Sequence, residues 1–241
     1  MFALCISVCT TTSNVTVIWE ENFDDLDDWT IFAYENSTSL VTKEGNFSVA
    51  DGTLKVLDDD FNVARRDSDV TVGSWLFDMY VVDDDEGWFY VVFMSNGTKP
   101  LDFSQEFVAV GAWISGGQFL AWQKSGDGVA VHSEMYMDSL QGLHHVKVNR
   151  TSGGHFEVYL NGVLRGFFDD NSVTNSTYLE IEGGNAAGCY IDNIIVSDDP
   201  NYPIPTPTTP PPGDFPWILV AVGGGVAVAV IVLTIVVLRR R

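Results

Sequence analysis

One uncharged stretch near the C-terminus constrains this chain more than any other feature of its sequence. Between Trp217 and Leu238 there are 22 residues without a charged side chain. A helix of that length, rising 1.5 Å per residue, crosses a hydrocarbon core of about 30 Å. Arg239–Arg241 follow at once, and basic residues beside a span stay cytoplasmic. We therefore predict a single-pass cell-membrane protein, with a transmembrane helix at 215–238 and a cytoplasmic basic tail at 239–241.

The segments that flank the main domain agree with export. Residues 1–13 combine a short apolar stretch with polar positions after it, as the core and cleavage zone of a signal peptide do. No basic residue precedes the apolar stretch, so the true start of this predicted signal peptide can lie upstream. Residues 200–214 are rich in proline and threonine. Such a segment favours an extended polyproline stalk that holds residues 14–199 away from the membrane.

Two further patterns concern the surface and the span. Six Asn-x-Ser/Thr sequons predict a glycoprotein if the host glycosylates: Asn14, Asn36, Asn46, Asn96, Asn149 and Asn175. Ala221, Gly225 and Ala229 place small residues on one face of the predicted span. Faces of this kind let two spans approach closely, so a homodimer through the membrane is a possible assembly.

The charge balance excludes one class of partner. The chain holds 33 acidic and 12 basic residues, for a formal net charge of −21. A surface this acidic repels phosphate backbones, so we expect no nucleic-acid partner. Attraction of divalent cations, attraction of basic surfaces and solubility at high salt all remain compatible with the same composition.

The region between the leader and the stalk has the pattern of an all-β domain. Short runs rich in β-branched and aromatic residues alternate with Gly, Asn and Asp clusters, which is typical of strands and turns. Asn161-Gly162 predicts a tight hairpin turn. In the run 75–81, Trp75, Phe77, Met79 and Val81 alternate with other residues and so form one apolar face. The candidate strands are Val15–Trp19, Thr53–Leu57, Val70–Val82, Trp88–Met94, Phe107–Ile114, Phe119–Gln123, His144–Asn149, Phe156–Leu160, Tyr178–Ile181 and Cys189–Val196.

Three stretches in order resemble known jelly rolls. Residues 17–29, VIWEENFDDLDDW, are similar to the opening of concanavalin A-like domains, especially family-16 glycoside hydrolases. Residues 143–168 look like a laminin G strand that leads into a hairpin, and residues 189–199, CYIDNIIVSDD, resemble the closing strand of the same fold. The resemblance implies a concanavalin A-like jelly-roll sandwich for residues 14–199, in addition to the transmembrane helix.

The resemblance also implies a structural calcium ion that ties the first strand to the last. Its ligands would fall on Glu21 or Asn22, on Gly52, and on Asp192. Calcium takes six to eight oxygen ligands, among them carboxylates and backbone carbonyls from separate segments, so the set is chemically reasonable. The alternative is that Asp192 only accepts backbone hydrogen bonds near the end of its strand.

Catalysis by the family-16 pattern is not expected from the sequence. Those hydrolases carry two carboxylates in an E-x-D-x-x-E arrangement, and this chain lacks it. The acidic pair Glu180 and Glu182 in YLEIEGG is interpreted as the solvated face of an ordinary strand. On this reasoning we predict that the chain is not an enzyme.

Aromatic residues are the best candidates for contact with a ligand, because Trp and Tyr rings stack against the C–H faces of sugars. The predicted set is Asp78, Tyr80, Tyr90, Trp113 and Trp122, although large aromatics more often fill the core of a sandwich. We predict an extracellular module, anchored in the membrane, that recognises a carbohydrate or a glycoprotein in adhesion or cell-surface structure. The alternatives are a coat protein without a specific ligand and a divergent glycoside hydrolase.

Overall fold

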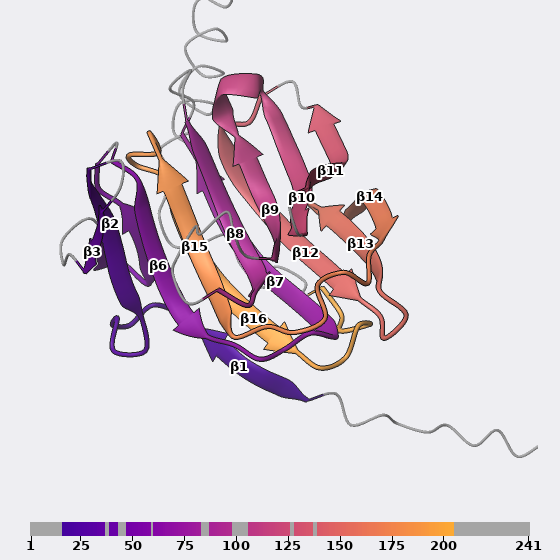
Figure 1. Ribbon diagram of the computed structural model, residues 1–241. Helices are drawn as coiled ribbons and strands as arrows, with labels where there is room; N and C mark the ends of the chain where they lie inside the picture. The colour runs from indigo at the N-terminus through magenta and orange to yellow at the C-terminus, as the bar shows by residue number, and fades with distance from the viewer. Residues whose placement is uncertain are drawn as a thin grey trace, which may run out of the picture. The chain divides into compact units, whose positions relative to one another are not determined.

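A computed structural model describes residues 16–36, 39–42, 47–58, 60–82, 87–97, 106–125, 128–136 and 139–204. These residues form two antiparallel β-sheets, one behind the other (Figure 1), and belong to a single compact unit. The described part of the chain holds no helix long and apolar enough to cross a membrane. The predicted span at Trp217–Leu238, the predicted signal peptide and most of the stalk lie outside the described residues.

The first sheet contains both the opening and the closing strand of the domain. Its order is β14-β13-β12-β7-β16-β5-β4, and β1 also pairs with β16. The strands are β1 (Val17–Glu21), β4 (Phe47–Ala50), β5 (Thr53–Val56), β7 (Gly73–Val81), β12 (Gly142–Arg150), β13 (His155–Leu160), β14 (Val163–Asp169) and β16 (Tyr190–Ser197).

The second sheet faces the viewer in Figure 1 and has the order β11-β10-β9-β8-β15-β6-β2-β3. Its strands are β2 (Thr30–Asn36), β3 (Ser39–Thr42), β6 (Asn62–Asp67), β8 (Trp88–Ser95), β9 (Phe107–Trp113), β10 (Gln118–Ser125), β11 (Gly128–Tyr136) and β15 (Tyr178–Gly184). A 3₁₀ turn, η1 (Ile114–Gly116), connects β9 to β10.

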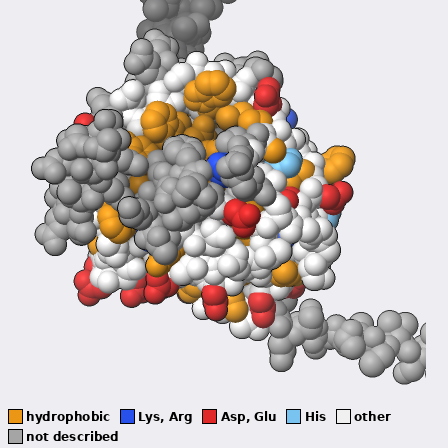
Figure 2. All heavy atoms as spheres, viewed as in Figure 1, with side chains coloured by type: hydrophobic (Ala, Val, Ile, Leu, Met, Phe, Trp, Pro, Cys, Tyr) orange, Lys and Arg blue, Asp and Glu red, His pale blue; other side chains and the backbone are white. Residues whose placement is uncertain are grey.

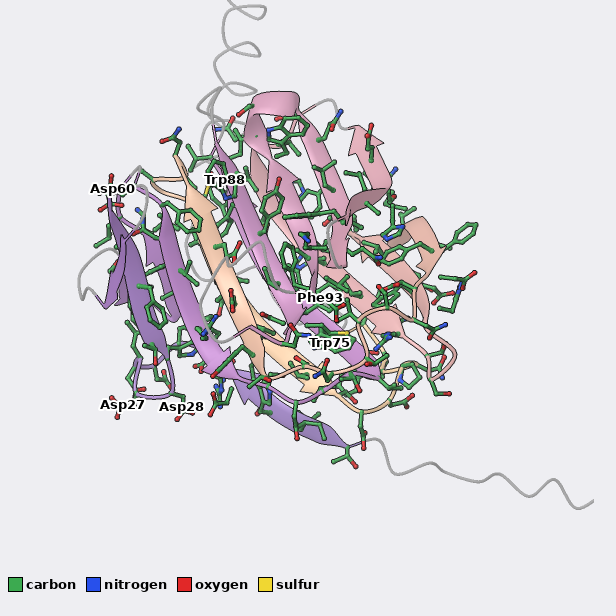
Figure 3. The ribbon with its side chains drawn as sticks, viewed as in Figure 1. Asp27, Asp28, Asp60, Trp75, Trp88 and Phe93 are labelled. Atoms are coloured by element: carbon green, nitrogen blue, oxygen red, sulfur yellow. The ribbon has the colours of Figure 1, made fainter. Side chains whose placement is uncertain are left out.

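Period-2 alternation builds the core between the sheets. Successive side chains of a strand point to opposite faces, so the apolar face predicted in β7 turns inward, and its residues are at most 2% exposed. The Trp75 ring lies 5.0 Å from the ring of Phe93 on the second sheet, centroid to centroid, and both residues are labelled in Figure 3. The all-β jelly-roll architecture predicted from the sequence is confirmed.

All ten predicted strands are present, and six others were not foreseen. The unforeseen strands β3 and β4 have only four residues each, too few to show a period. The unforeseen strand β6 contains Arg65 and Arg66, two consecutive charged residues that interrupt the apolar pattern by which a strand is recognised. The Asn161-Gly162 turn does join β13 to β14, with φ values of 52° and 76°, as a tight hairpin of this type requires.

Truncation of the central core aromatic should be costly. We expect Trp75→Ala to lower the free energy of unfolding by about 3–5 kcal/mol, because it leaves a large cavity between the sheets. Phe167→Ala is the matched control, since Phe167 lies on β14 and is 67% exposed; its effect should stay within about 0.5 kcal/mol. Urea unfolding of the full-length chain in detergent, followed by circular dichroism, measures both. Equal effects of the two substitutions would contradict the assigned core.

Candidate functional site

The outer face of the second sheet, the face turned away from the core, gathers polar and aromatic side chains. On β15 the residues Leu179 and Ile181 point into the core and are fully buried. Because side chains alternate along a strand, Tyr178, Glu180 and Glu182 share the outer face. Alternation along YLEIE thus places both carboxyl groups on the same side of the sheet.

Strand pairing brings specific neighbours to these two acids. Glu182 lies opposite Tyr90 on β8 and Val63 on β6. Glu180 lies opposite Arg65 on β6. Residues directly opposite in an antiparallel pair have Cβ atoms about 4.5–5.5 Å apart, so these side chains are in contact range.

Glu180 is held by an ion pair within the sheet. Arg65 donates to Oε1 of Glu180 from Nε at 3.0 Å and from Nη2 at 2.6 Å. The two side chains are only 6% and 2% exposed. A buried carboxylate needs such a partner to remain ionised, so Glu180 carries the negative charge of this pair.

Glu182 has no equivalent partner. It is 1% exposed, and neither carboxyl oxygen accepts a hydrogen bond from a donor among the described residues. Burial raises the pKa of Glu182 well above its usual value, the neighbouring Glu180 raises it further, and Arg65 opposes the rise. Glu182 is therefore the protonated member of the pair and can donate its proton to the Glu180 carboxylate. The interpretation of these acids as a solvated strand face was wrong, because burial, which the alternation cannot reveal, excludes water from both.

Aromatic rings adjoin the carboxyl pair on the same face. The Tyr90 ring is 8% exposed and meets the Trp122 ring edge to face, with centroids 5.7 Å apart. Trp122 in turn meets Phe107 at 4.8 Å. Gly111 makes room for this packing, since a Cβ atom at that position would lie 2.7 Å from Cδ1 of Tyr90. Burial is the largest cause that raises the pKa of Tyr90, so its phenol stays neutral.

A pair of tryptophans occupies the end of this face. Trp88 on β8 and Trp113 on β9 are directly opposite each other, and Trp113 is 44% exposed. The ring of Phe61 lies 5.9 Å from that of Trp88. Trp88 is labelled near the upper end of the sheet in Figure 3, and hydrophobic side chains gather at that end in Figure 2. We call Trp88 and Trp113 the tryptophan platform.

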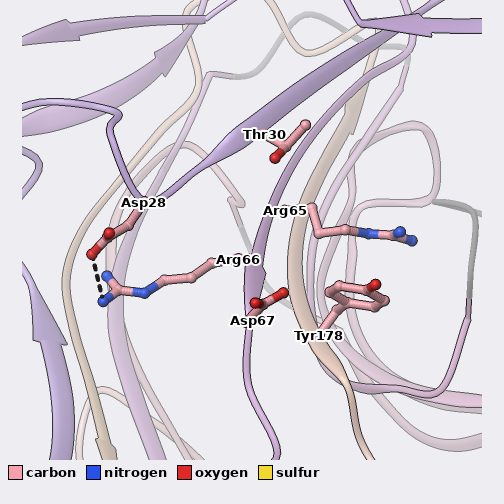
Figure 4. A pocket seen from close by; sticks show the side chains of 6 residues that line it. All are labelled: Asp28, Thr30, Arg65, Arg66, Asp67 and Tyr178. Carbon is pink, nitrogen blue, oxygen red and sulfur yellow. Dashed lines mark ion pairs between the residues drawn. The ribbon is translucent and has the colours of Figure 1, made fainter.

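A polar hollow of about 340 Å³ lies further along β15, toward Tyr178 (Figure 4). The Arg65 guanidinium carbon lies 4.1 Å from the centroid of the Tyr178 ring. Arg66 forms ion pairs with Asp28 at 2.9 Å and with Glu21 at 2.7 Å. The residues that line the hollow are Asp28, Thr30, Arg65, Arg66, Asp67 and Tyr178.

The structure divides the predicted ligand contacts between two faces. Tyr90, Trp113 and Trp122 belong to the second sheet, as described above. Asp78 and Tyr80 instead lie on the outer face of the first sheet, where Oδ1 of Asp78 is 2.5 Å from Nδ1 of His145. There the Tyr80 ring stacks on Tyr190 with centroids 4.8 Å apart. These five residues therefore do not form one site.

The residues predicted to bind calcium lie on or beside neighbouring strands of the first sheet. β16 pairs with β1 up to the Glu21–Ile194 contact and with β5 from the Ile191–Leu54 contact, so Asp192 lies where the partner changes. The carbonyl oxygen of Asn22 would lie 3.3 Å from a Cβ atom built on Gly52.

Carboxylate and carbonyl oxygens are the donor types that calcium takes, so the chemistry of these three segments is compatible with the predicted ion. Burial raises the pKa of Asp192, a backbone hydrogen bond from Asn193 opposes the rise, and the nearby Asp78 adds to it. The carboxylate of Glu21 already has protein partners, since it accepts hydrogen bonds from the Phe23 amide and from Trp29 Nε1. Within the described ranges, no three or more His, Cys, Asp or Glu side chains cluster in a way that could hold a metal, so backbone carbonyls would have to complete the set.

Three sequon asparagines have described side chains. Asn175 is exposed and Asn96 is half-buried. Asn149 is 6% exposed, and its side chain bonds Ser74 and Glu157 within the sheet; it is the least accessible of the three. Asn14 and Asn46 lie outside the described residues, and Asn36 ends β2 without a described side chain.

Comparison with known proteins supports the fold. No family model matches the chain, and no curated protein matches its sequence. A family-16 endo-β-1,3(4)-glucanase crystallised with an oligosaccharide is similar over 77% of this chain and 95% of its own, with a TM-score of 0.60 and 12% identity. The laminarinase catalytic domain from Thermotoga maritima is similar over 78% and 99%, with a TM-score of 0.56 and 12% identity. The globular domain of T. cruzi calreticulin is similar over 76% and 88%, with a TM-score of 0.57 and 13% identity.

These likenesses correct the prediction that the chain is not an enzyme. The chain shares its fold with endo-glucanases, so the missing E-x-D-x-x-E pattern is not sufficient to exclude hydrolysis. At 12–13% identity the likeness shows the fold alone and does not establish an activity. Arg65, Glu180 and Glu182 were not among the predicted site residues. The one available signal was the spacing of the two glutamates in YLEIE.

Glu182 should make the free energy of unfolding depend on pH. The pKa of Glu182 is raised in the folded state. Protonated Glu182 therefore contributes its full stabilisation to the free energy of unfolding below its unfolded-state pKa, near 4.5. That stabilisation is lost as the pH rises through the folded-state pKa. The slope between these limits can reach about 1.4 kcal/mol per pH unit. Glu182→Gln cannot ionise, so its unfolding free energy should fall less steeply with pH and should exceed that of the wild type at neutral pH.

Glu20→Gln is the control, since Glu20 is exposed on β1, and it should keep the wild-type slope. Denaturant unfolding of the full-length chains between pH 4 and pH 8 measures the three slopes. A Glu182→Gln slope equal to that of the wild type would show that Glu182 is already ionised in the folded protein.

Proposed function

We propose that this protein recognises carbohydrate outside the cell, and that the glycan lies on the outer face of the second sheet. The observation that carries the proposal is the tryptophan platform. A ring 44% exposed at Trp113, paired with Trp88, offers an apolar surface for the C–H face of a sugar ring. Isolated exposed aromatics are common, but a cross-strand pair beside buried polar groups is the composition of a ligand site.

Polar atoms without partners on the same face support this assignment. Trp122 Nε1 and Gln118 Oε1 are buried and have no hydrogen-bond partner in the described part of the chain, and the buried carboxyl group of Glu182 accepts no hydrogen bond there. Buried polar groups normally have partners. The hydroxyl groups of a sugar both donate and accept hydrogen bonds, so a glycan could satisfy donors and acceptors together.

A divergent glycoside hydrolase is the second candidate function. It is favoured by the carboxyl pair, because one acid is held protonated while its neighbour is held ionised by Arg65. A pair of carboxyl groups in different environments is the usual component of acid–base chemistry on sugars. Endo-glucanases and laminarinases among the solved structures of similar fold are consistent with either function.

The cellular setting of the proposal rests on the sequence. Anchoring by the uncharged span at 215–238, the stalk, the cytoplasmic tail, pairing of spans and glycosylation are parts of the same hypothesis. The glycan would then belong to a neighbouring surface or to a glycoprotein. A role as a coat component without a specific ligand is the outcome if no glycan binds.

Removal of the exposed tryptophan should weaken binding to a neutral glycan. We expect Trp113→Ala to reduce the affinity of the full-length chain in detergent for soluble β-1,3-glucan by roughly tenfold, which corresponds to about 1.4 kcal/mol. Phe167→Ala removes a still more exposed aromatic from the other sheet and should leave the affinity unchanged. Isothermal titration calorimetry measures both. If Trp113→Ala leaves the affinity unchanged, the glycan does not bind at the tryptophan platform.

Calcium should stabilise the folded domain if the site at Asp192 is real. A ligand that binds only the folded state raises the unfolding temperature, so a shift that saturates with calcium is expected relative to a chelator. Asp192→Asn should abolish the shift, whereas Asp198→Asn, an exposed position beyond the end of β16, should retain it. Thermal unfolding of the full-length chains provides the test. An identical melting temperature in calcium and in chelator would remove calcium from the proposal.

A further inference from the structure

The polar hollow shares a residue with the carboxyl pair. Arg65 lines the hollow and also holds Glu180. Its guanidinium group lies over the Tyr178 ring on the same wall, as the close-up in Figure 4 shows. A change in the position of the Arg65 side chain therefore changes the shape of the hollow.

The charges around the hollow select against anionic ligands. The positive charge of Arg65 is matched by Glu180, and that of Arg66 by Glu21 and Asp28. Asp67 adds a further exposed carboxylate to the lining. The set of two arginines and four acids is net negative, so a uronic acid or a sulfated sugar would be repelled. Carboxylate, hydroxyl and guanidinium groups beside an aromatic ring are suited to the hydroxyls of a neutral sugar.

Glu182 determines how firmly Arg65 is held to Glu180. The groups that face Glu182 are Glu180 on its own strand, Tyr90 on β8, and Arg65 with the apolar Val63 on β6. Arg65 is thus the sole cation among these neighbours in the described structure, and of the two glutamates it forms its ion pair with Glu180. When Glu182 is protonated, the charged groups among these neighbours are Arg65 and Glu180, and their charges cancel.

Loss of that proton would place two negative charges next to each other in a site that excludes water. Arg65 would then be shared between two carboxylates two residues apart on β15, and Glu182 is the one farther from Tyr178 along the strand. Its guanidinium group would be drawn away from Tyr178 and from the hollow. The raised pKa of Glu182 agrees with the protonated form in the folded protein.

We propose that the hollow is a second sugar-binding subsite for a neutral pyranose, and that Glu182 is a positioning residue whose proton keeps Arg65 in the wall of that subsite. This inference rests on the proposed function, because it extends the glycan from the tryptophan platform along β15. It makes recognition of the glycan depend on acidity. Affinity falls as Glu182 loses its proton.

The test is a pH profile of binding by the full-length chain in detergent, with oligosaccharides of β-1,3-glucan as the probe. Wild-type affinity should fall by about tenfold between acid pH and the upper end of the profile. Glu182→Gln keeps the size and the neutral charge of the protonated acid, so its affinity should stay at the acid value throughout. Trp113→Ala should weaken binding at every pH and keep the wild-type profile.

Asp67→Asn tests the hollow without touching the buried pair. Because Asp67 is exposed, the variant should fold, and it should lose affinity for the neutral oligosaccharide without a change in the shape of the profile. An oligosaccharide of uronic acids should fail to compete. Effective competition by the uronic acid, or full affinity of Asp67→Asn, would overturn the hollow as a subsite for a neutral sugar.

The outcomes separate this inference from the function on which it rests. Wild-type binding that Trp113→Ala weakens, with no difference between the pH profiles of wild type and Glu182→Gln, refutes the role of Glu182 and leaves carbohydrate recognition intact. No binding of the neutral oligosaccharide at any pH, by a wild-type chain shown to be folded by circular dichroism, refutes the proposed function itself. Release of new reducing ends that Glu182→Gln abolishes would show that Glu182 acts on substrate directly and would replace the positioning role.

Discussion

The buried ion pair between Arg65 and Glu180 is the interaction on which the outer face of the second sheet depends. Both groups are withdrawn from water, and the loss of hydration costs several kcal/mol per ion unless the geometry is good. Two N–H groups of Arg65 on one carboxylate oxygen supply that geometry. The pair joins β6 to β15 and orders a guanidinium group over Tyr178, so one contact determines both the state of the acids and the wall of the hollow.

The core-facing side and the polar outer side of the second sheet result from the same alternation of side chains. Each strand of the second sheet sends one set of side chains into the core and the other set outward. On β15 this separates Leu179 and Ile181 from Glu180 and Glu182. The proposed site therefore lies on the same strands that carry these core residues. The cost appears at Glu182, where a buried carboxyl group accepts no hydrogen bond from the described residues. Buried carboxyl groups with perturbed pKa values cluster at sites that bind or react.

The fold could be predicted well from particular residues, and the site could not. The apolar face of β7 and the Asn161-Gly162 turn have local causes, namely side-chain period and turn geometry, and both were found where the sequence placed them. The short strand β3 and the arginine-bearing strand β6 lack such local signals. The predicted ligand residues Tyr80 and Tyr90 lie on different sheets. The alternation of side chains along a strand shows which residues share a face of that strand, but it does not show which sheet the strand joins. The calcium ligands at Asn22, Gly52 and Asp192 were predicted only through a resemblance to jelly rolls and stay a prediction.

The sequence by itself determined the all-β class, the apolar core face, the acidic surface charge and the uncharged C-terminal stretch, because these depend on composition and on spacing along the chain. The tertiary structure alone decided which acids are buried and which arginine reaches them. Arg65 and Glu180 are 115 residues apart in the chain and 2.6 Å apart at their charged atoms. Charge, burial and pKa are set by neighbours in space, and strand order brings those neighbours together across distances that no local pattern records.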